Sequence, residues 1–240
     1  MRCRSGKSLI PEVFGLDLLL ATPHYVVERV KREQARRWCP LLSGQVLDIG
    51  CGHSPYLRFL GNATRYIGVE METRYSPEVV ASSSSLPFPD GSMDGVMLTE
   101  VLEHLPEPAD ALREARRVLR PGGWLYVTVP MTWGLHYQPH DYYRFTNWGI
   151  AYLLAKSGFE VHRTQRFGGL FTIISARLAA LLSGLLLEPP LRWLGVERGR
   201  LRACALSLAL FNLPAYYLSR ALDRLGDEDA LGWAVVARRE

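Results

Sequence analysis

The stretch Val46-Leu47-Asp48-Ile49-Gly50-Cys51-Gly52-His53-Ser54-Pro55 decides the fold. Residues 45–49 form a short apolar run with one acid near its end, which predicts a buried parallel strand. Gly50 and Gly52 then allow a tight turn that brings backbone N–H groups close to a ligand. Residues 54–60 are expected to form a helix whose positive N-terminal end faces the same ligand. A strand, a glycine turn and a helix in this order are typical of nucleotide-like cofactor sites in open α/β sheets.

The residues around this turn limit the kind of cofactor. A dinucleotide fingerprint would place a third glycine three residues after Gly52, where this chain has Pro55. Asp48 stands two residues before the first glycine, where its carboxylate could face a cationic ligand. Glu70 ends the next predicted strand, residues 66–69, and could accept hydrogen bonds from two ribose hydroxyls, which would also suit NAD. A purely structural turn is the other interpretation of so short a motif.

Length, charge and cysteine spacing set broad limits on the size of the core, the partners and the cellular compartment. A chain of 240 residues can bury one substantial core with an appendage, and its net charge of +4 favours acidic partners only slightly. The four cysteines contain no CxxC pair, so neither a disulfide framework nor a zinc site is indicated, and a reducing compartment is expected. Glu12 and Asp17 interrupt the N-terminal apolar residues, so no cleaved signal peptide is predicted.

Further elements follow at regular intervals. Helices are expected at about 24–42, 108–119 and 146–157, and strands at 78–81, 94–99, 124–129, 159–164 and 232–237. The basic residues of the second of these helices, Arg117 among them, are expected mainly on its outer face. Alternating strands and helices predict an α/β sheet.

Four segments in this order resemble the class I S-adenosylmethionine-dependent methyltransferases. They are residues 46–52, residues 86–94, the Glu100-Val101-Leu102-Glu103-His104 run and the Arg117–Gly123 run. The resemblance is greatest to the branch that includes ubiquinone and menaquinone biosynthesis enzymes, and it covers roughly residues 44–166 and the last strand. It implies a Rossmann-like, seven-stranded, mostly parallel sheet of order 3-2-1-4-5-7-6, flanked by helices, and it excludes NAD.

The resemblance also implies S-adenosylmethionine as cofactor. The glycine turn would bind its methionine portion, the acid after the second strand its ribose hydroxyls, two serines would flank the adenine, and the end of the fourth strand would line the cofactor. The family usually has an acid near Ser82, whose hydroxyl can accept the same hydrogen bond. The segment between the second and third strands looks too short for the family's usual helix. The implied binding residues are Asp48, Gly50, Cys51, Gly52, Glu70, Ser82, Ser83, Leu98 and Thr99.

The loop after the fifth strand offers candidates for catalysis. Methyl transfer from a sulfonium is an in-line displacement in which the protein aligns the acceptor and, where needed, removes a proton. Residues 133–144 are rich in histidine and aromatic side chains and follow the carboxyl end of a strand, where α/β sites lie. His136 or His140 could act as general base. Alternatively, these residues only shape and close the pocket.

The Glu100, Glu103 and His104 cluster, with His136 or His140 as a further ligand, could instead hold a divalent cation. This pattern is similar to metal-assisted O-methyltransferases, including some quinone-biosynthesis enzymes and small-RNA 3′-end methyltransferases. Many relatives carry the same residues without a metal, with the acid as a cap and the histidine packed near the cofactor. We therefore predict a reaction without a metal ion. No basic stripe interleaved with aromatics is visible, so no nucleic-acid partner is expected.

The seventh strand arrives more than sixty residues after the sixth, so residues 169–229 form an insertion. Two apolar stretches, 169–187 and 203–219, are interrupted by Arg177 and by Asn212 and Pro214, which disfavours helices that span a membrane. Arginines between them, at 192, 198, 200 and 202, would suit phospholipid headgroups. Peripheral membrane contact through residues 169–219 is one prediction, and a helical lid or a homodimer face is the other.

The predicted organisation is an N-terminal arm and helix (1–43), a methyltransferase domain (44–168 and 230–240) and the apolar helical insertion (169–229). We predict a cytoplasmic S-adenosylmethionine-dependent methyltransferase that acts on a small, apolar, lipid-carried or glycan-type acceptor. One alternative is a metal-assisted O-methyltransferase. The other is a non-catalytic cofactor-binding scaffold whose insertion recruits a partner.

Overall fold

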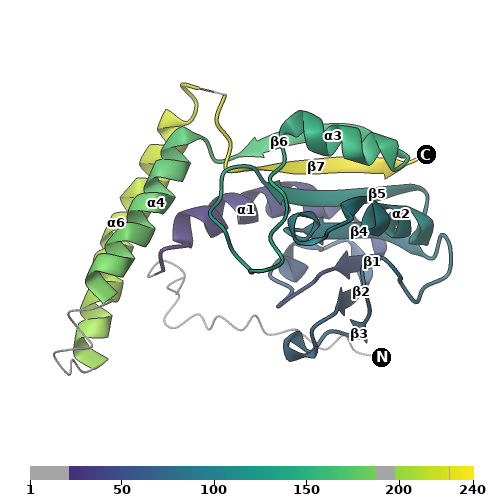
Figure 1. Ribbon diagram of the computed structural model, residues 1–240, viewed down its shortest axis with the longest axis horizontal. Helices are drawn as coiled ribbons and strands as arrows, with labels where there is room; N and C mark the ends of the chain where they lie inside the picture. Colours follow the sequence, from purple (N-terminus) through teal and green to yellow (C-terminus); the bar gives the residue numbers. More distant parts are fainter. Residues whose placement is uncertain (1–21, 188–197, 227) are drawn as a thin grey trace. The chain divides into compact units, whose positions relative to one another are not determined.

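The computed structural model describes residues 22–187, 198–226 and 228–240. They form two compact units (Figure 1). The sheet unit contains Gln34–Arg166 and Gly232–Glu240. The hairpin unit contains the described parts of Leu9–Glu33 and of Phe167–Leu231, so the insertion expected at residues 169–229 falls within it. Arg192, one of the arginines assigned to membrane headgroups, lies outside the described residues.

Seven strands form one sheet in the order β3-β2-β1-β4-β5-β7-β6, which confirms the predicted order. Strands β1 to β5 pair in parallel, and β7 is antiparallel to β5. Because the strands of a parallel sheet end at the same edge, the residues after β1, β2, β4 and β5 meet there. The strands are β1(Gly44–Ile49), β2(Ala63–Glu70), β3(Val79–Val80), β4(Met93–Thr99), β5(Leu119–Pro130), β6(Phe159–Phe167) and β7(Gly232–Arg239).

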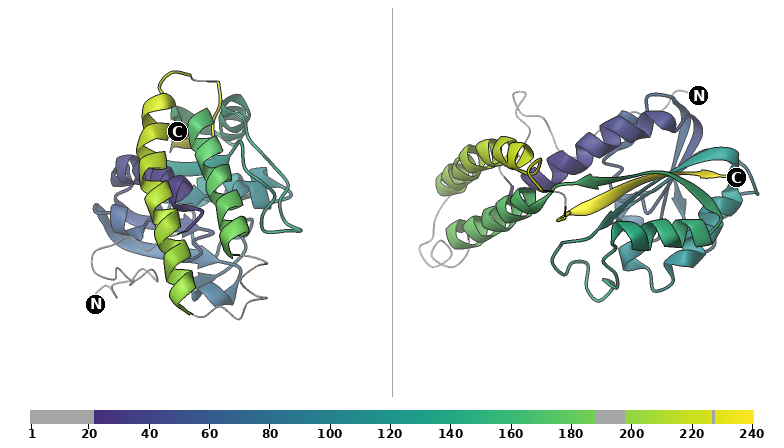
Figure 2. Two further views of the ribbon diagram at one scale, coloured as in Figure 1. Left: turned by 90° about the vertical axis from the view of Figure 1, so that its left-hand side faces the viewer. Right: turned by 90° about the horizontal axis from the view of Figure 1, so that it is seen from above.

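Helices α2(Pro108–Val118) and α3(Asn147–Lys156) cover one face of the sheet (Figure 2). Helix α2 begins with a proline in its first turn, where a missing N–H costs no hydrogen bond. Its apolar residues recur at helical spacing and belong to one buried hydrophobic cluster with side chains of β1, β4, β5 and β7. The N-cap of α3 is Thr146, whose hydroxyl accepts a hydrogen bond from the Gly149 N–H at 3.0 Å.

Arg117 differs from its predicted position on the outer face of α2. Its guanidinium donates to the carbonyl oxygens of Leu86 and Phe88 at 2.9 and 2.8 Å. It also pairs with Glu114 and Asp90, which raises the pKa of Arg117 further above its ordinary value. The arginine therefore ties the turn before β4 to helix α2.

The helix predicted at residues 54–60 is absent from the structure. This segment instead consists of successive i→i+3 turns, with a short 3₁₀ turn, η3(Leu57–Phe59). Only six residues separate Ser54 from the Gly61-Asn62 turn, which is too short for a stable α-helix, and Ser54 has a positive φ of 53°. No helix dipole therefore faces the glycine turn from this segment. The β2–β3 connection carries only the 3₁₀ turn η4(Thr73–Tyr75), in agreement with its predicted shortness.

The hairpin unit contains the long helices α4(Leu170–Leu187) and α6(Arg198–Leu222), which lie side by side (Figures 1 and 2), and the first part of α1(Tyr25–Trp38). Both apolar stretches of the insertion are therefore helical, as expected. Asp223 accepts hydrogen bonds from the N–H groups of Gly169 and Phe171 and from the Thr172 hydroxyl at the start of α4. Within residues 22–187, 198–226 and 228–240, no helix is both long enough and apolar enough to cross a membrane.

Candidate functional site

The glycine turn after β1 is tight, as predicted, but the N–H groups of Gly50, Cys51 and Gly52, which were expected to face a ligand, donate to groups within the protein. Gly50 and Gly52 have positive φ angles of 71° and 48°, which strain any residue with a side chain. A Cβ atom on Gly50 would lie 2.5 Å from Cγ2 of Val101, so space also requires glycine there. The N–H groups of Gly50 and Cys51 donate to the carbonyl of Val69 at 2.8 and 3.1 Å, which holds the turn against β2.

Asp48 is buried beneath this turn, with 1% of its surface exposed. Its Oδ2 accepts a hydrogen bond from the Tyr66 hydroxyl at 2.7 Å, and its Oδ1 has no hydrogen-bond partner among the described residues. Burial raises the pKa of Asp48 to about 7; the Tyr66 hydrogen bond lowers this pKa and the negative charge of Glu70 raises it. A buried carboxylate oxygen without a partner is a ready acceptor for a cationic group.

Tyr66 is a site residue that sequence analysis missed. Its hydroxyl lies 2.7 Å from Asp48 and 2.8 Å from the Ser54 hydroxyl, so it links β1 to the residues after the glycine turn. The contact between Tyr66 and Asp48 follows from the register of β1 against β2, because Asp48 pairs with Gly68 and Tyr66 lies two residues before Gly68, on the same face of β2. The sequence alone does not give that register, so the contact could not be predicted.

Glu70 approaches the same turn from the end of β2. Its Oε2 accepts a hydrogen bond from the Gly52 N–H at 3.3 Å, and its Oε1 accepts one from Met71 at 2.8 Å. Two carboxylates therefore converge on the glycine turn. The Cys51 thiol is buried there, and burial raises its pKa to about 12, so it is a neutral packing group.

The remaining predicted cofactor residues differ in position. Ser82 closes a small turn, with its hydroxyl 2.9 Å from the Ser84 hydroxyl, and Ser83 is half-buried beside it. Thr99 is half-buried at the end of β4. Leu98 was expected to line the cofactor, but its side chain is fully buried in the core. We correct this expectation, since alternation along β4 directs that side chain into the apolar core.

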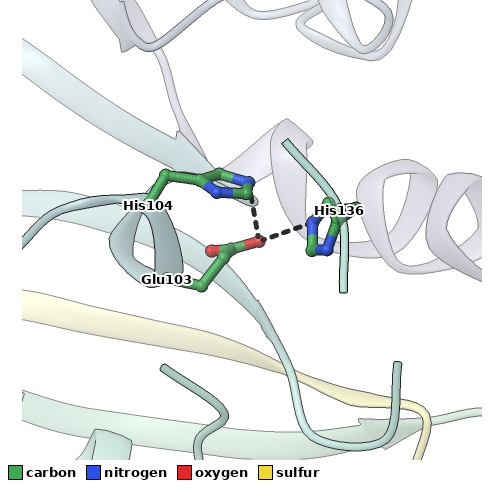
Figure 3. Close-up of side chains that lie close together, drawn as sticks. All are labelled: Glu103, His104 and His136. Carbon is green, nitrogen blue, oxygen red and sulfur yellow. Dashed lines mark ion pairs between the residues drawn. The ribbon is translucent and has the colours of Figure 1, made fainter. Parts of the chain in front are cut away.

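A second group of side chains lies beyond β4 (Figure 3). Glu103, fully buried in the 3₁₀ turn η5(Leu102–His104), has its Oε1 atom 3.7 Å from Nε2 of His104 and 4.0 Å from Nε2 of His136. One ligand atom from each of these residues lies within 4.8 Å of the others. Glu100, expected in this cluster, has a φ of 55° and is not part of the group.

Contacts at the opposite ring nitrogens orient both imidazoles. Nδ1 of His104 lies 2.6 Å from the backbone carbonyl oxygen of His140, which can only accept, so Nδ1 carries the proton. Nδ1 of His136 lies 3.2 Å from the Gly134 carbonyl and 3.5 Å from Asp141. Both Nε2 atoms therefore face Glu103. Burial lowers the pKa of His104, so its ring favours the neutral form.

An ion pair holds the loop that supplies His136. The guanidinium of Arg144 contacts both oxygens of Asp141, at 2.7 and 2.8 Å, and also donates to the Gly134 carbonyl. Asp141 in turn accepts a hydrogen bond from the His136 N–H at 2.9 Å, and the Arg144 pair holds the pKa of Asp141 well below its usual range. Sequence analysis placed both residues in the loop without recognising this pairing.

His140 takes a different position from the one expected of a base. Its side chain is exposed and lies 3.2 Å from the Tyr142 hydroxyl, so only its backbone carbonyl reaches the Glu103, His104 and His136 group. The structure thus brings one of the two predicted loop histidines to the acidic group. In the same loop, the centre of the Tyr137 ring lies 5.1 Å from that of the His104 ring. The Tyr137 hydroxyl accepts a hydrogen bond from the Arg74 guanidinium at 3.1 Å.

The parallel sheet, the glycine turn and its two acids define a class of α/β proteins that bind a nucleotide-like cofactor at the carboxyl edge of the sheet. Residues 47–127 match the family model described as a methyltransferase domain. Together with curated methyltransferases that are similar over about half of this chain, this match identifies residues 47–127 as a methyltransferase domain of the class I S-adenosylmethionine-dependent type. The expected resemblance is confirmed, and S-adenosylmethionine is the cofactor of that family.

Three similar proteins illustrate the relationship. The 27-O-demethylrifamycin SV methyltransferase of Amycolatopsis mediterranei is 30% identical over 146 residues, which are 51% of this chain and 53% of that protein. The ubiquinone biosynthesis O-methyltransferase of Albidiferax ferrireducens is 25% identical over 124 residues, 45% of this chain and 49% of that protein. The chain thus spans about half the length of these two curated relatives. A solved methyltransferase from Archaeoglobus fulgidus shares the fold, with a TM-score of 0.55, 18% identity, and coverage of 88% of this chain and 94% of that one.

Proposed function

We propose that this protein transfers the methyl group of S-adenosylmethionine to a small acceptor. The observation that carries the proposal is the convergence of Asp48 and Glu70 on the glycine turn, with Oδ1 of Asp48 buried and without a partner among the described residues. Asp48 would accept from the cationic amino acid portion of the cofactor, and Glu70 from its ribose hydroxyls. Thr99 and the Ser82–Ser83 turn would complete the cofactor site.

We place acceptor activation at the Glu103, His104 and His136 group. His136 is the better of the two candidate bases, because its Nε2 atom faces buried Glu103 while the side chain of His140 faces Tyr142. The bound cofactor supplies an electrophilic methyl group. The chain then holds the acceptor in line and receives its proton at Nε2 of His136, and Glu103 would stabilise the resulting imidazolium.

The acceptor proposed is small and apolar, lipid-carried or of glycan type. Two observations support it: the names of the two relatives above, which refer to 27-O-demethylrifamycin SV and to ubiquinone biosynthesis, and the exposed apolar side chains of the hairpin unit. Peripheral contact of residues 169–219 with a membrane belongs to this proposal. A lid or a homodimer face is the alternative role of that segment.

Calorimetry with S-adenosylmethionine tests the cofactor site. Asp48→Asn and Glu70→Gln should each weaken binding about ten- to hundredfold, since each removes a charge-assisted hydrogen bond worth about 1.5–3 kcal/mol. Binding that stays unchanged in both folded variants contradicts the assignment. A scaffold without activity would bind the cofactor in the same way, so turnover has to be measured as well.

Turnover on candidate acceptors tests the histidine assignment with a matched pair of variants. His136→Ala should lower kcat about 10²–10⁴-fold with unchanged cofactor affinity, as expected for a positioned base. His140→Ala keeps the backbone carbonyl that orients His104, so its kcat should stay within about threefold of wild type. Equal losses in both variants would assign the loop a shaping role only.

The second candidate is a metal-assisted O-methyltransferase, and the arrangement in Figure 3 favours it. Two imidazole Nε2 atoms and one buried carboxylate are a ligand set suited to a divalent transition metal, and His136 would then be a ligand instead of a base. The expectation of a metal-free reaction remains a prediction. Activity that survives exhaustive chelation supports the base, whereas loss that is restored by added Mn²⁺ or Mg²⁺ supports the metal.

A further inference from the structure

Among the described residues, four that are not glycine have a positive φ, and each lies on a different loop at the carboxyl edge of the sheet. They are Ser54 after β1, Ser76 after β2, Glu100 after β4 and Tyr137 after β5, with φ angles of 53°, 51°, 55° and 56°. This conformation is unfavourable for a residue with a bulky side chain, so it persists only where surrounding contacts hold it. Positions of this kind gather at ligand clamps and switch regions.

Side-chain contacts of Tyr137 join the loop after β5 to the loop after β2. Its hydroxyl accepts a hydrogen bond from the Arg74 guanidinium at 3.1 Å, and Cζ of Arg74 lies 5.8 Å from the centre of its ring. Glu72 holds the same guanidinium, with Oε2 2.5 Å from Nε of Arg74. The Tyr75 ring also contacts it, with the ring centre 4.8 Å from Cζ. Two loops that lie far apart in the sequence therefore meet at one arginine.

A row of ring contacts extends from this arginine to the other two loops. His53, directly after the glycine turn, packs edge-on against Tyr75 with ring centres 4.8 Å apart. At the other end, the Tyr137 ring lies 5.1 Å from the His104 ring, which lies 4.7 Å from the ring of His136. The last two side chains are those drawn in Figure 3. The row consequently runs from the proposed cofactor side to the proposed acceptor side.

The contact between Arg74 and Tyr137 bridges the ends of two strands. In the sheet order, β1 and β4 lie between β2 and β5, so the two outer strands are about 14 Å apart. The residues assigned to the cofactor at the ends of β1 and β4 therefore lie between the two loops. A Cβ atom on Gly52 would meet no other atom of the described residues within 4 Å, so there is space for a ligand beside the glycine turn.

This contact can open without disturbing the core. The exposed fractions are 44% for Tyr137 and 60% for the Arg74 side chain, and contacts between exposed groups contribute little to stability. Arg74 keeps its partner Glu72 when the contact breaks, because both residues lie on the loop after β2. Opening also allows the Tyr137 backbone to leave its unfavourable conformation.

We propose that Arg74 and Tyr137 form a strap across the cofactor site, which opens to admit and to release the cofactor. The proposal rests on the proposed function for the identity of the ligand at the glycine turn. A wall that touches the bound ligand is the other role for these side chains, and kinetics distinguishes the two. Loss of a strap that is closed with and without ligand speeds both entry and exit, whereas loss of a ligand contact speeds only exit.

Stopped-flow binding of S-adenosylmethionine to the full chain tests the strap. Arg74→Ala should raise the association and dissociation rate constants at least about fivefold each, with Kd within about threefold of wild type. Tyr137→Phe keeps the ring contacts and should raise both at least about twofold. The control Arg113→Ala removes an equally exposed arginine from α2 and should change neither. Unchanged rate constants in Arg74→Ala overturn the proposal, and so does weaker binding through dissociation alone.

Hydrogen–deuterium exchange of the unliganded protein provides a readout that needs no cofactor. The His140 N–H donates to the Tyr137 carbonyl at 3.1 Å within the loop after β5. Its exchange should be at least about threefold faster in Arg74→Ala than in wild type or Arg113→Ala, although Arg74 lies on the loop after β2. Equal exchange in the three proteins overturns the strap. Wild type that binds no S-adenosylmethionine, with exchange that responds as expected, would refute the proposed function alone.

Discussion

Lowering the pH from 8 to 6 should weaken S-adenosylmethionine binding about tenfold, because the pKa of Asp48 is raised to about 7 in the unliganded protein. The carboxylate is about nine-tenths ionised at pH 8 and about one-tenth ionised at pH 6. If only the ionised form accepts the cationic portion of the cofactor, affinity follows that fraction. A tenfold change corresponds to about 1.4 kcal/mol, which titration calorimetry resolves readily.

Two variants separate Asp48 from other groups that titrate in this range. Asp48→Asn removes the titrating group and retains an acceptor for Tyr66, so its weaker binding should lose the tenfold pH dependence. Tyr66→Phe removes the hydrogen bond that lowers the Asp48 pKa, so the midpoint of the binding curve should move to higher pH. Wild-type affinity that changes less than about twofold between pH 6 and 8 refutes the reasoning. So does an Asp48→Asn variant with the wild-type slope.

The ionised carboxylate of Asp48 should also lower the free energy of unfolding. Its folded-state pKa of about 7 lies above the ordinary value of 3.8, so the folded protein binds the proton more tightly than the unfolded chain. The contribution of Asp48 to the free energy of unfolding therefore falls as pH rises from about 4 to 7, by at most about 4 kcal/mol. Asp48→Asn should raise the melting temperature at pH 8 while it weakens cofactor binding. A lower melting temperature in that variant would show that the ionised carboxylate is stabilised in the folded state.

Two further predictions concern the scaffold. Arg117→Ala should lower the free energy of unfolding by about 2–3 kcal/mol, because it removes several charge-assisted hydrogen bonds that anchor the turn before β4. The control Arg113→Ala, on the exposed face of α2, should change it by less than about 0.5 kcal/mol. Denaturant titration measures both variants, and equal effects would contradict the anchoring role. Gly50→Ala should unfold the turn or reduce cofactor affinity at least about tenfold, since its Cβ would clash with Val101 at a positive φ. Gly61→Ala, where a Cβ would meet open space, serves as the control. Thermal melting and calorimetry measure both variants, and normal cofactor binding in Gly50→Ala would show that the turn can relax.

Local signals explain what could be predicted from the sequence. The turn at Gly50 and Gly52 and the acids Asp48 and Glu70 lie at the ends of β1 and β2, where strand pattern and chain position determine the location of a residue. The sheet order followed from the family resemblance. The helix predicted at residues 54–60 was wrong, because its sequence pattern was weak and the turn that begins at Gly61 leaves too few residues for a stable α-helix.

Contacts between distant segments could not be predicted in the same way. The inward orientation of Arg117 depends on backbone carbonyls exposed in another turn, and the choice between His136 and His140 depends on the path of one loop. In the hairpin unit, the leucine-rich sequence predicted helices but did not reveal that Thr172, Ala176 and Ala179 would be buried positions of α4. Which face of an apolar helix is buried is set by its neighbour, and hydrophobic periodicity is weak when apolar residues surround the helix.

The cofactor residues and the proposed base of the candidate site are held in place by different parts of the structure. The groups assigned to the cofactor lie at or just after the ends of β1, β2, β3 and β4, so the sheet holds them in place. His136 is instead supplied by a loop whose course depends on one ion pair, between Asp141 and Arg144, and on the carbonyl of Gly134. Breaking that pair should therefore disturb the acceptor side while leaving the cofactor side intact. If acceptor preference changes during evolution of this scaffold, the loop from β5 to α3 can change with the least cost to cofactor binding, since none of the carboxylates at the glycine turn depends on it.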